Sequence, residues 1–121
     1  MFKGIEHTAI ATPDPEVLAQ WYEKNLGFPI CYRYGGNVFV KAPDGTMLEL
    51  IPSIGERVKT AIKTPGIRHL AIKVEDFDAA VQGLERQGIE IFDRVEGANR
   101  LAFFRDPEGN ILHLIYREKA L

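Results

Sequence analysis

The sequence is poor in cysteine, in excess charge of one sign and in long apolar segments. Its 121 residues contain one cysteine, Cys31, so an intrachain disulfide and a CxxC redox or zinc motif are both excluded. We expect this thiol to be buried and unreactive. Fifteen Lys and Arg against seventeen Asp and Glu give a formal net charge of −2 at pH 7. This balance removes the electrostatic basis for nucleic-acid binding.

Segments that direct a chain to a membrane are also missing. No apolar run approaches the roughly 20 residues of a membrane helix, and residues 1–6 lack the apolar stretch of a signal peptide. We therefore expect no membrane partner and a cytoplasmic location. The motifs GxxxxGK[ST], GxGxxG and GxSxG do not occur either, so phosphate loops, dinucleotide fingerprints and nucleophile elbows are unsupported.

What the sequence does contain is an internal repeat. Residues 4–10 (GIEHTAI) recur as residues 66–72 (GIRHLAI), and residues 43–51 (PDGTMLELI) recur as residues 107–115 (PEGNILHLI). The offset is 62 positions for the first pair and 64 for the second, so the halves differ by only two inserted residues. The repeat predicts two modules of one kind.

Each half carries the same order of expected elements. Apolar residues at helical spacing follow Asp14 in the first half and Asp76 in the second, and Gly27 and Gly88 end the two patterns. Short apolar runs bounded by turn residues then predict three strands in each half. These runs cover residues 30–34, 37–42 and 47–51, and residues 90–95, 100–105 and 111–116.

We therefore predict one α+β domain made of two βαβββ modules. The first module spans about residues 1–53, the second about 65–117, and a linker occupies about 53–64. A unit of about 50 residues cannot easily bury both faces of its elements. We expect the two sheets to combine into a curved, cup-shaped mixed sheet with the helices outside.

Four polar residues interrupt apolar strands at equivalent places of the repeat: His7, Glu49, His69 and His113. All three histidines of the chain belong to this set. A carboxylate between two leucines, as at Glu49, is costly to bury unless it is paired, protonated or bound to a metal. Imidazole and carboxylate ligands suit Ni, Fe, Co, Mn or Zn. We predict that the four residues bind one divalent metal ion per site.

The number of open coordination positions decides what such an ion can do. An octahedral ion with four protein ligands keeps about two positions for a substrate with two neighbouring oxygens. Tetrahedral zinc would keep none, and the site would then be structural.

The segments IEHTAI (5–10), WYEKNLGF (21–28), RHLAI (68–72) and LAFFRDPEGN (101–110) extend the pattern over nearly the whole chain. With them, the sequence resembles the vicinal oxygen chelate superfamily, which includes glyoxalase I, extradiol dioxygenases and bleomycin-resistance proteins. The resemblance implies paired βαβββ modules whose first and last strands supply the metal ligands. Those positions fall here at His7, Glu49, His69 and His113.

One ligand position departs from the glyoxalase pattern, in which a glutamate usually stands where this chain has His113. Glu49 is then the carboxylate ligand left to act as a general base beside the metal. The resemblance implies a glyoxalase-like lyase or isomerase acting on a small substrate with vicinal oxygens. The alternatives are an extradiol-type non-haem iron dioxygenase and a non-catalytic protein that sequesters an antibiotic or metabolite.

Substrate contacts are expected from the walls and rim of the cup. The candidates are Arg33, Asn37, Phe39, Arg100 and Phe103. Arg100 is favoured as an anion contact because it begins a strand beside Asn99. Members of the superfamily often pair, so we expect a homodimer, and the sequence leaves open whether the metal ligands come from one chain or from two.

Overall fold

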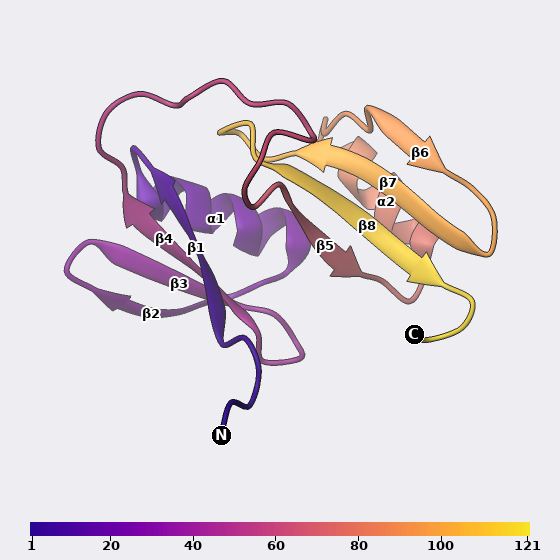
Figure 1. Ribbon diagram of the computed structural model, residues 1–121, viewed down its shortest axis with the longest axis horizontal. Helices are drawn as coiled ribbons and strands as arrows, with labels where there is room; N and C mark the ends of the chain where they lie inside the picture. Colours follow the sequence, from indigo (N-terminus) through magenta and orange to yellow (C-terminus); the bar gives the residue numbers. More distant parts are fainter. The chain divides into compact units, whose positions relative to one another are not determined.

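The computed structural model describes residues 1–121 as two compact units, residues 1–57 (module 1) and 58–121 (module 2) (Figure 1). Their boundary lies inside the segment expected to be the linker. Module 1 contains β1 (His7–Thr12), α1 (Pro15–Leu26), β2 (Ile30–Tyr34), β3 (Asn37–Lys41) and β4 (Met47–Pro52). Module 2 contains β5 (His69–Lys73), α2 (Phe77–Arg86), β6 (Asp93–Val95), β7 (Asn99–Arg105) and β8 (Ile111–Arg117).

Each module forms its own four-stranded mixed sheet. The strand order is β1-β4-β3-β2 in module 1 and β5-β8-β7-β6 in module 2. In each sheet the first strand of the module runs parallel to the last, and the remaining pairs are antiparallel. The predicted α+β class and the paired βαβββ modules are confirmed.

The helices begin where the sequence places their capping residues. The Asp14 side chain accepts a hydrogen bond from the Val17 N–H at 3.2 Å, and Asp76 does the same for Ala79 at 3.0 Å. Gly27 ends α1 in the left-handed conformation at φ 69°, which glycine adopts without steric cost. The caps therefore fix where both helices begin and where α1 ends.

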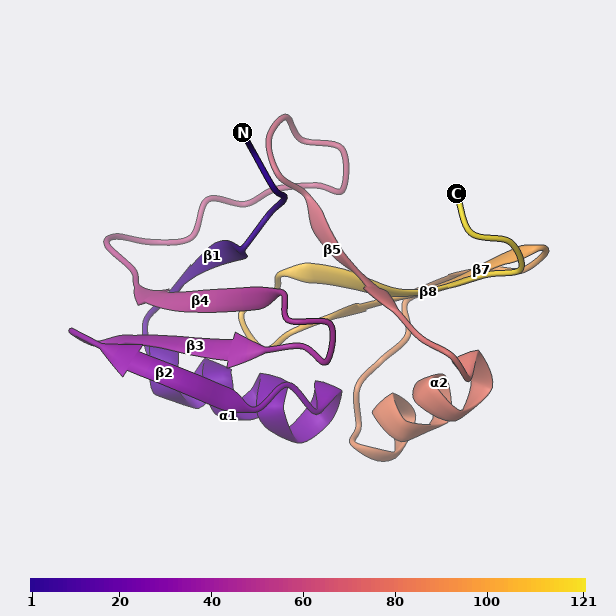
Figure 2. The ribbon, with the colours of Figure 1, turned by 90° about the horizontal axis from the view of Figure 1, so that it is seen from below.

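In each module the helix packs against one face of the sheet (Figure 2). Val38, Val40, Leu48 and Leu50 are buried on the α1 side of module 1. Ala102, Phe104, Leu112 and Leu114 are the equivalent buried residues of module 2. We call these the helix faces. Because strand side chains alternate, His7, Phe39 and Glu49 share the opposite face of module 1, and His69, Phe103 and His113 share that of module 2. We call these the histidine faces.

Two local expectations are wrong. Cys31 is exposed rather than buried, because β2 is an edge strand of its sheet. The strand expected from residue 90 begins only at Asp93. The exit from α2 occupies the preceding residues, since the Ile89 N–H still bonds to the Leu84 carbonyl at 3.1 Å.

Neither helix combines the length and the apolar character that a membrane crossing requires.

Candidate functional site

In module 1, the parallel pairing of β1 and β4 brings His7 and Glu49 together. His7 lies opposite Met47, and Glu49 is two residues farther along β4 on the same face. The Nε2 atom of His7 is 3.4 Å from Oε1 of Glu49. Glu49 is only 8% exposed, so its carboxylate is buried beside an imidazole.

The other oxygen of Glu49 has its own partners. The Tyr34 hydroxyl donates to Oε2 at 3.0 Å, and the Asn37 amide donates to the same atom at 3.1 Å. Two donors from the β2–β3 hairpin therefore fix the carboxylate and leave Oε1 facing His7. Hydrogen bonds to a ligating carboxylate are a usual feature of metal sites.

Module 2 repeats the arrangement with two imidazoles. His69 lies opposite Ile111, and His113 is two residues farther along β8. The ring centroids of His69 and His113 are 4.7 Å apart. Burial lowers the pKa of His113, opposed in part by its hydrogen bond to the Leu114 carbonyl, and the charges of His69 and Arg117 lower it further. His113 is therefore neutral at pH 7, which is the form that binds metals.

Two of the histidines have an acceptor beside Nδ1. For His7 it is Oε1 of Glu6 at 2.9 Å, and for His113 it is the Leu114 carbonyl at 3.2 Å. An acceptor at this position favours the tautomer with the proton on Nδ1, which leaves the lone pair of Nε2 for a metal. Ligating histidines usually have such an outer partner. The donor set therefore fits a divalent ion.

The structure gathers the four predicted ligands as two pairs, one in each module. No group of three or more His, Cys, Asp or Glu side chains forms a metal-binding cluster in residues 1–121. Each module by itself therefore supplies two donors.

Equivalent phenylalanines pack beside the two pairs. Phe39 is the register partner of Glu49, and its ring meets that of His7 edge-on at 5.3 Å. Phe103 is the register partner of His113, with ring centroids 4.9 Å apart. These predicted substrate contacts, together with Asn37, lie on the histidine faces.

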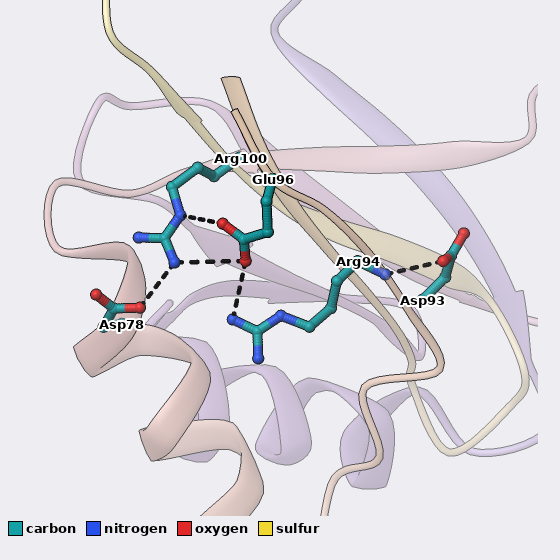
Figure 3. Close-up of polar contacts among 5 residues, drawn as sticks. All are labelled: Asp78, Asp93, Arg94, Glu96 and Arg100. Carbon is teal, nitrogen blue, oxygen red and sulfur yellow. Dashed lines mark hydrogen bonds and ion pairs between the residues drawn. The ribbon is translucent and has the colours of Figure 1, made fainter. Parts of the chain in front are cut away.

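Arg33 and Arg100 lie on the helix faces instead. Arg33 donates to both carboxylate oxygens of Glu16 in α1. Arg100 pairs with Asp78 of α2 at 2.9 Å and with Glu96 at 2.7 Å (Figure 3). Its guanidinium also lies 4.3 Å from the centre of the Phe77 ring. Both arginines therefore connect a sheet to its helix, on the side away from the histidines.

Two further residues, absent from the set predicted from the sequence, share a face or a contact with the candidate ligands. Glu6 contacts His7. Its position directly before the histidine of the first repeat is the feature of the sequence that could have identified it. Arg105 ends β7 on the histidine face of module 2, 64 positions after Lys41. A basic residue therefore stands at the same position of both repeats, and this recurrence could have identified Arg105 from the sequence.

Comparison with known proteins gives a consistent result. The family model of the Glyoxalase/Bleomycin resistance protein/Dioxygenase superfamily matches residues 4–114. The uncharacterized protein YwkD of Bacillus subtilis (strain 168) is 35% identical over 120 residues, covering 89% of this chain and 92% of YwkD. The uncharacterized protein YaeR of Escherichia coli (strain K12) is 32% identical over 123 residues, covering 93% and 95%.

Solved structures share the architecture. A glyoxalase family protein from Enterococcus faecalis superposes with a TM-score of 0.80 at 27% identity, covering 95% of this chain and 98% of that one. A lactoylglutathione lyase from Agrobacterium tumefaciens gives a TM-score of 0.72 at 19% identity, covering 95% of this chain and 94% of that one, and that likeness shows the fold alone.

Proposed function

The chain belongs to the Glyoxalase/Bleomycin resistance protein/Dioxygenase superfamily, and from this membership we propose that it is a divalent-metal-dependent, glyoxalase-like lyase or isomerase. Its substrate is a small molecule with vicinal oxygens. The observation that carries the proposal is the pairing of the buried Glu49 carboxylate with Nε2 of His7. His69 and His113 complete the ligand set, from the same chain or from the partner in a homodimer.

Each residue then has a definite role. The ion, when bound, polarises the neighbouring oxygens of the substrate. Glu49 takes a proton from the carbon next to a carbonyl group, as a general base. Tyr34 and Asn37 hold its Oε2 atom, so Oε1 is the atom that accepts the proton. Asn37, Phe39 and Phe103 are the proposed substrate contacts on the histidine faces.

One observation favours a second function, an extradiol-type iron dioxygenase. The two donors on Oε2 hold Glu49 in one orientation, and a fixed carboxylate with histidines is the ligand set of non-haem iron oxygenases. His113 also occupies the place where a second carboxylate would be needed for proton shuttling in the glyoxalase pattern. In this role Glu49 binds iron and transfers no proton.

Assays with a substrate class suited to each reaction distinguish these functions. The protein is reconstituted in turn with Ni, Co, Mn, Fe(II) or Zn and assayed with 2-oxoaldehydes and with catechols. Isomerisation that is lost in Glu49→Gln supports the lyase or isomerase. Oxygen consumption with catechols and Fe(II) alone contradicts it and supports the dioxygenase. Tight binding without product contradicts both and leaves a sequestering protein.

A further inference from the structure

Arg105 occupies a place beside the histidine pair of module 2. In the sheet register Arg105 and His69 are both partners of Ile111, so the three residues form one row across β7, β8 and β5. Residues of one row share a face of the sheet. The next row on this face holds Phe103 and His113. Arg105 therefore lies on the same face of the sheet as the candidate metal ligands, two strands away from His69.

The guanidinium of Arg105 is held without a counter-charge. It lies 3.9 Å from the centre of the Phe92 ring, the cation–π arrangement that arginine favours. No carboxylate lies within 4.0 Å of it. By contrast, Arg33, Arg94 and Arg100 on the helix faces each have a carboxylate partner at 3.4 Å or less. Phe92 orients the Arg105 donors while leaving them available.

The other charged residues on the histidine face of module 2 are mostly positive, as Arg105 is. Strand alternation places Lys73 and Arg117 on this histidine face as well, and Asp93 is the one carboxylate among its strand residues. All four charged side chains belong to exposed residues. Three cations against one anion give this face an excess of two positive charges, which attracts anions.

We propose that Arg105 is a specificity-determining residue that binds a carboxylate or phosphate group of the substrate. This inference rests on the proposed function and narrows its substrate class to small anions with vicinal oxygens. Neighbouring strands lie about 4.8 Å apart, so the backbones of Arg105 and His69 are about 10 Å apart across β8. A small molecule bound beside His69 would therefore need an anionic group at its far end to meet the guanidinium, whose planar donors suit bidentate binding.

Binding of simple anions to the metal-free protein tests this role independently of metal chemistry. Inorganic phosphate and oxalate are each titrated into ¹⁵N-labelled protein in the presence of a chelator, and amide shifts are followed. We expect saturable shifts in β7 and β8, with affinity about tenfold weaker in Arg105→Gln because charge-assisted hydrogen bonds are lost. Arg86→Gln, which changes an exposed arginine at the end of α2, is the matched control and should bind as wild type.

The second variant, Arg105→Lys, keeps the charge and should retain an intermediate affinity. Stronger binding of phosphate than of oxalate indicates phosphate esters, and the reverse order indicates carboxylates. Equal affinity in wild type and Arg105→Gln overturns the proposal, as does the absence of shifts in β7 and β8 for both anions. A spectrum of Arg105→Gln with the same dispersion of amide resonances as the wild type, recorded before the titration, confirms that the variant is folded.

If wild type binds no metal, the function proposed above fails while the anion result still decides the role of Arg105.

Discussion

Tyr34 is the residue whose effect on the candidate site is easiest to isolate. Its hydroxyl is one of two donors to Oε2 of Glu49. Tyr34→Phe removes that donor, and loss of an outer partner of a metal ligand typically costs about 10- to 100-fold in metal affinity. We expect a loss in this range when metal binding is measured by isothermal titration calorimetry.

Tyr32 provides a matched control two residues away on the same strand and face. Its ring is 5.9 Å from that of Tyr34, and its hydroxyl has no hydrogen bond in the structure. Tyr32→Phe should therefore bind metal as the wild type does. Equal affinities in both variants would mean that the Tyr34 hydroxyl does not support a ligand.

Substitution of Glu49 tests whether this residue acts as a general base or only as a metal ligand. Glu49→Gln keeps the size of the side chain but removes its capacity to accept a proton. If Glu49 is the general base, kcat for a 2-oxoaldehyde should fall by about 10²- to 10⁴-fold. The rates are compared at saturating metal, so that weaker binding of the ion is not mistaken for lost base catalysis. A rate within twofold of wild type under those conditions would exclude Glu49 as the base.

The pairings of single residues could be predicted only in part. His7 with Glu49, and His69 with His113, follow from the repeat and from strand alternation, both of which are local patterns. The carboxylate partners of Arg100 could not be assigned in the same way. Asp78 lies 22 positions away on a helix, and only the packing of α2 on its sheet brings it to the guanidinium.

Among the elements, α2 is held to its sheet by a charged network with a predictable pH dependence (Figure 3). The guanidinium of Arg100 lowers the pKa of Asp78 and of Glu96 below their ordinary values of 3.8 and 4.5. Groups with a lowered pKa in the folded state stabilise it above the ordinary pKa, and this contribution is lost as pH falls through the lowered values. The network therefore stabilises the fold at neutral pH, begins to weaken below about pH 4.5, and is lost only when the pH falls below the lowered pKa values.

Arg100→Met removes this contribution. We expect a lower thermal unfolding midpoint at pH 7 and a smaller difference from wild type at pH 3, measured by circular dichroism. Because Asp78 and Glu96 are largely exposed, salt should also reduce the difference. Arg86→Met, at the end of the same helix, is the control for a change of surface charge. A difference between Arg100→Met and wild type that stays constant from pH 7 to pH 3 would contradict the network's role.

Elements with strong local signals were predictable, whereas edges were not. The Asp14 and Asp76 side chains cap the helices and Gly27 adopts the left-handed conformation, so both helix starts and the end of α1 match the sequence. The end of α2 is capped at Gln87, one residue before the expected Gly88. The exposure of Cys31 depends on β2 being an edge strand, which is decided by strand order. Strand order results from pairing between segments that are distant in the sequence, so local sequence patterns do not predict it.

The whole molecule consists of two modules of one kind, and the proposed four-ligand site requires residues from both kinds of module. Each module supplies two of the four proposed ligands, so both kinds of module must contribute. We predict a homodimer, whose mass by light scattering should be twice the 13.6 kDa of one chain. A mass of one chain at micromolar concentration would contradict this prediction.

Mixed subunits then show where a site is assembled. His7→Ala and His69→Ala chains are unfolded together, refolded and analysed for metal. If ligands come from two chains, some mixed dimers carry one intact site and regain metal. If they come from one chain, no mixture regains it, because every chain lacks a ligand.

The three histidines and Glu49 are proposed to bind one divalent ion. Elemental analysis of untagged protein, purified without added metal and again after reconstitution, measures this binding without an assay of activity. We predict about one Ni, Co, Mn, Fe or Zn ion per site in the wild type, and its loss in His7→Ala, Glu49→Ala and His113→Ala. Glu118→Ala, in the exposed C-terminal segment, should keep the ion. A wild-type protein without metal after reconstitution, or variants that all retain it, would contradict the assignment.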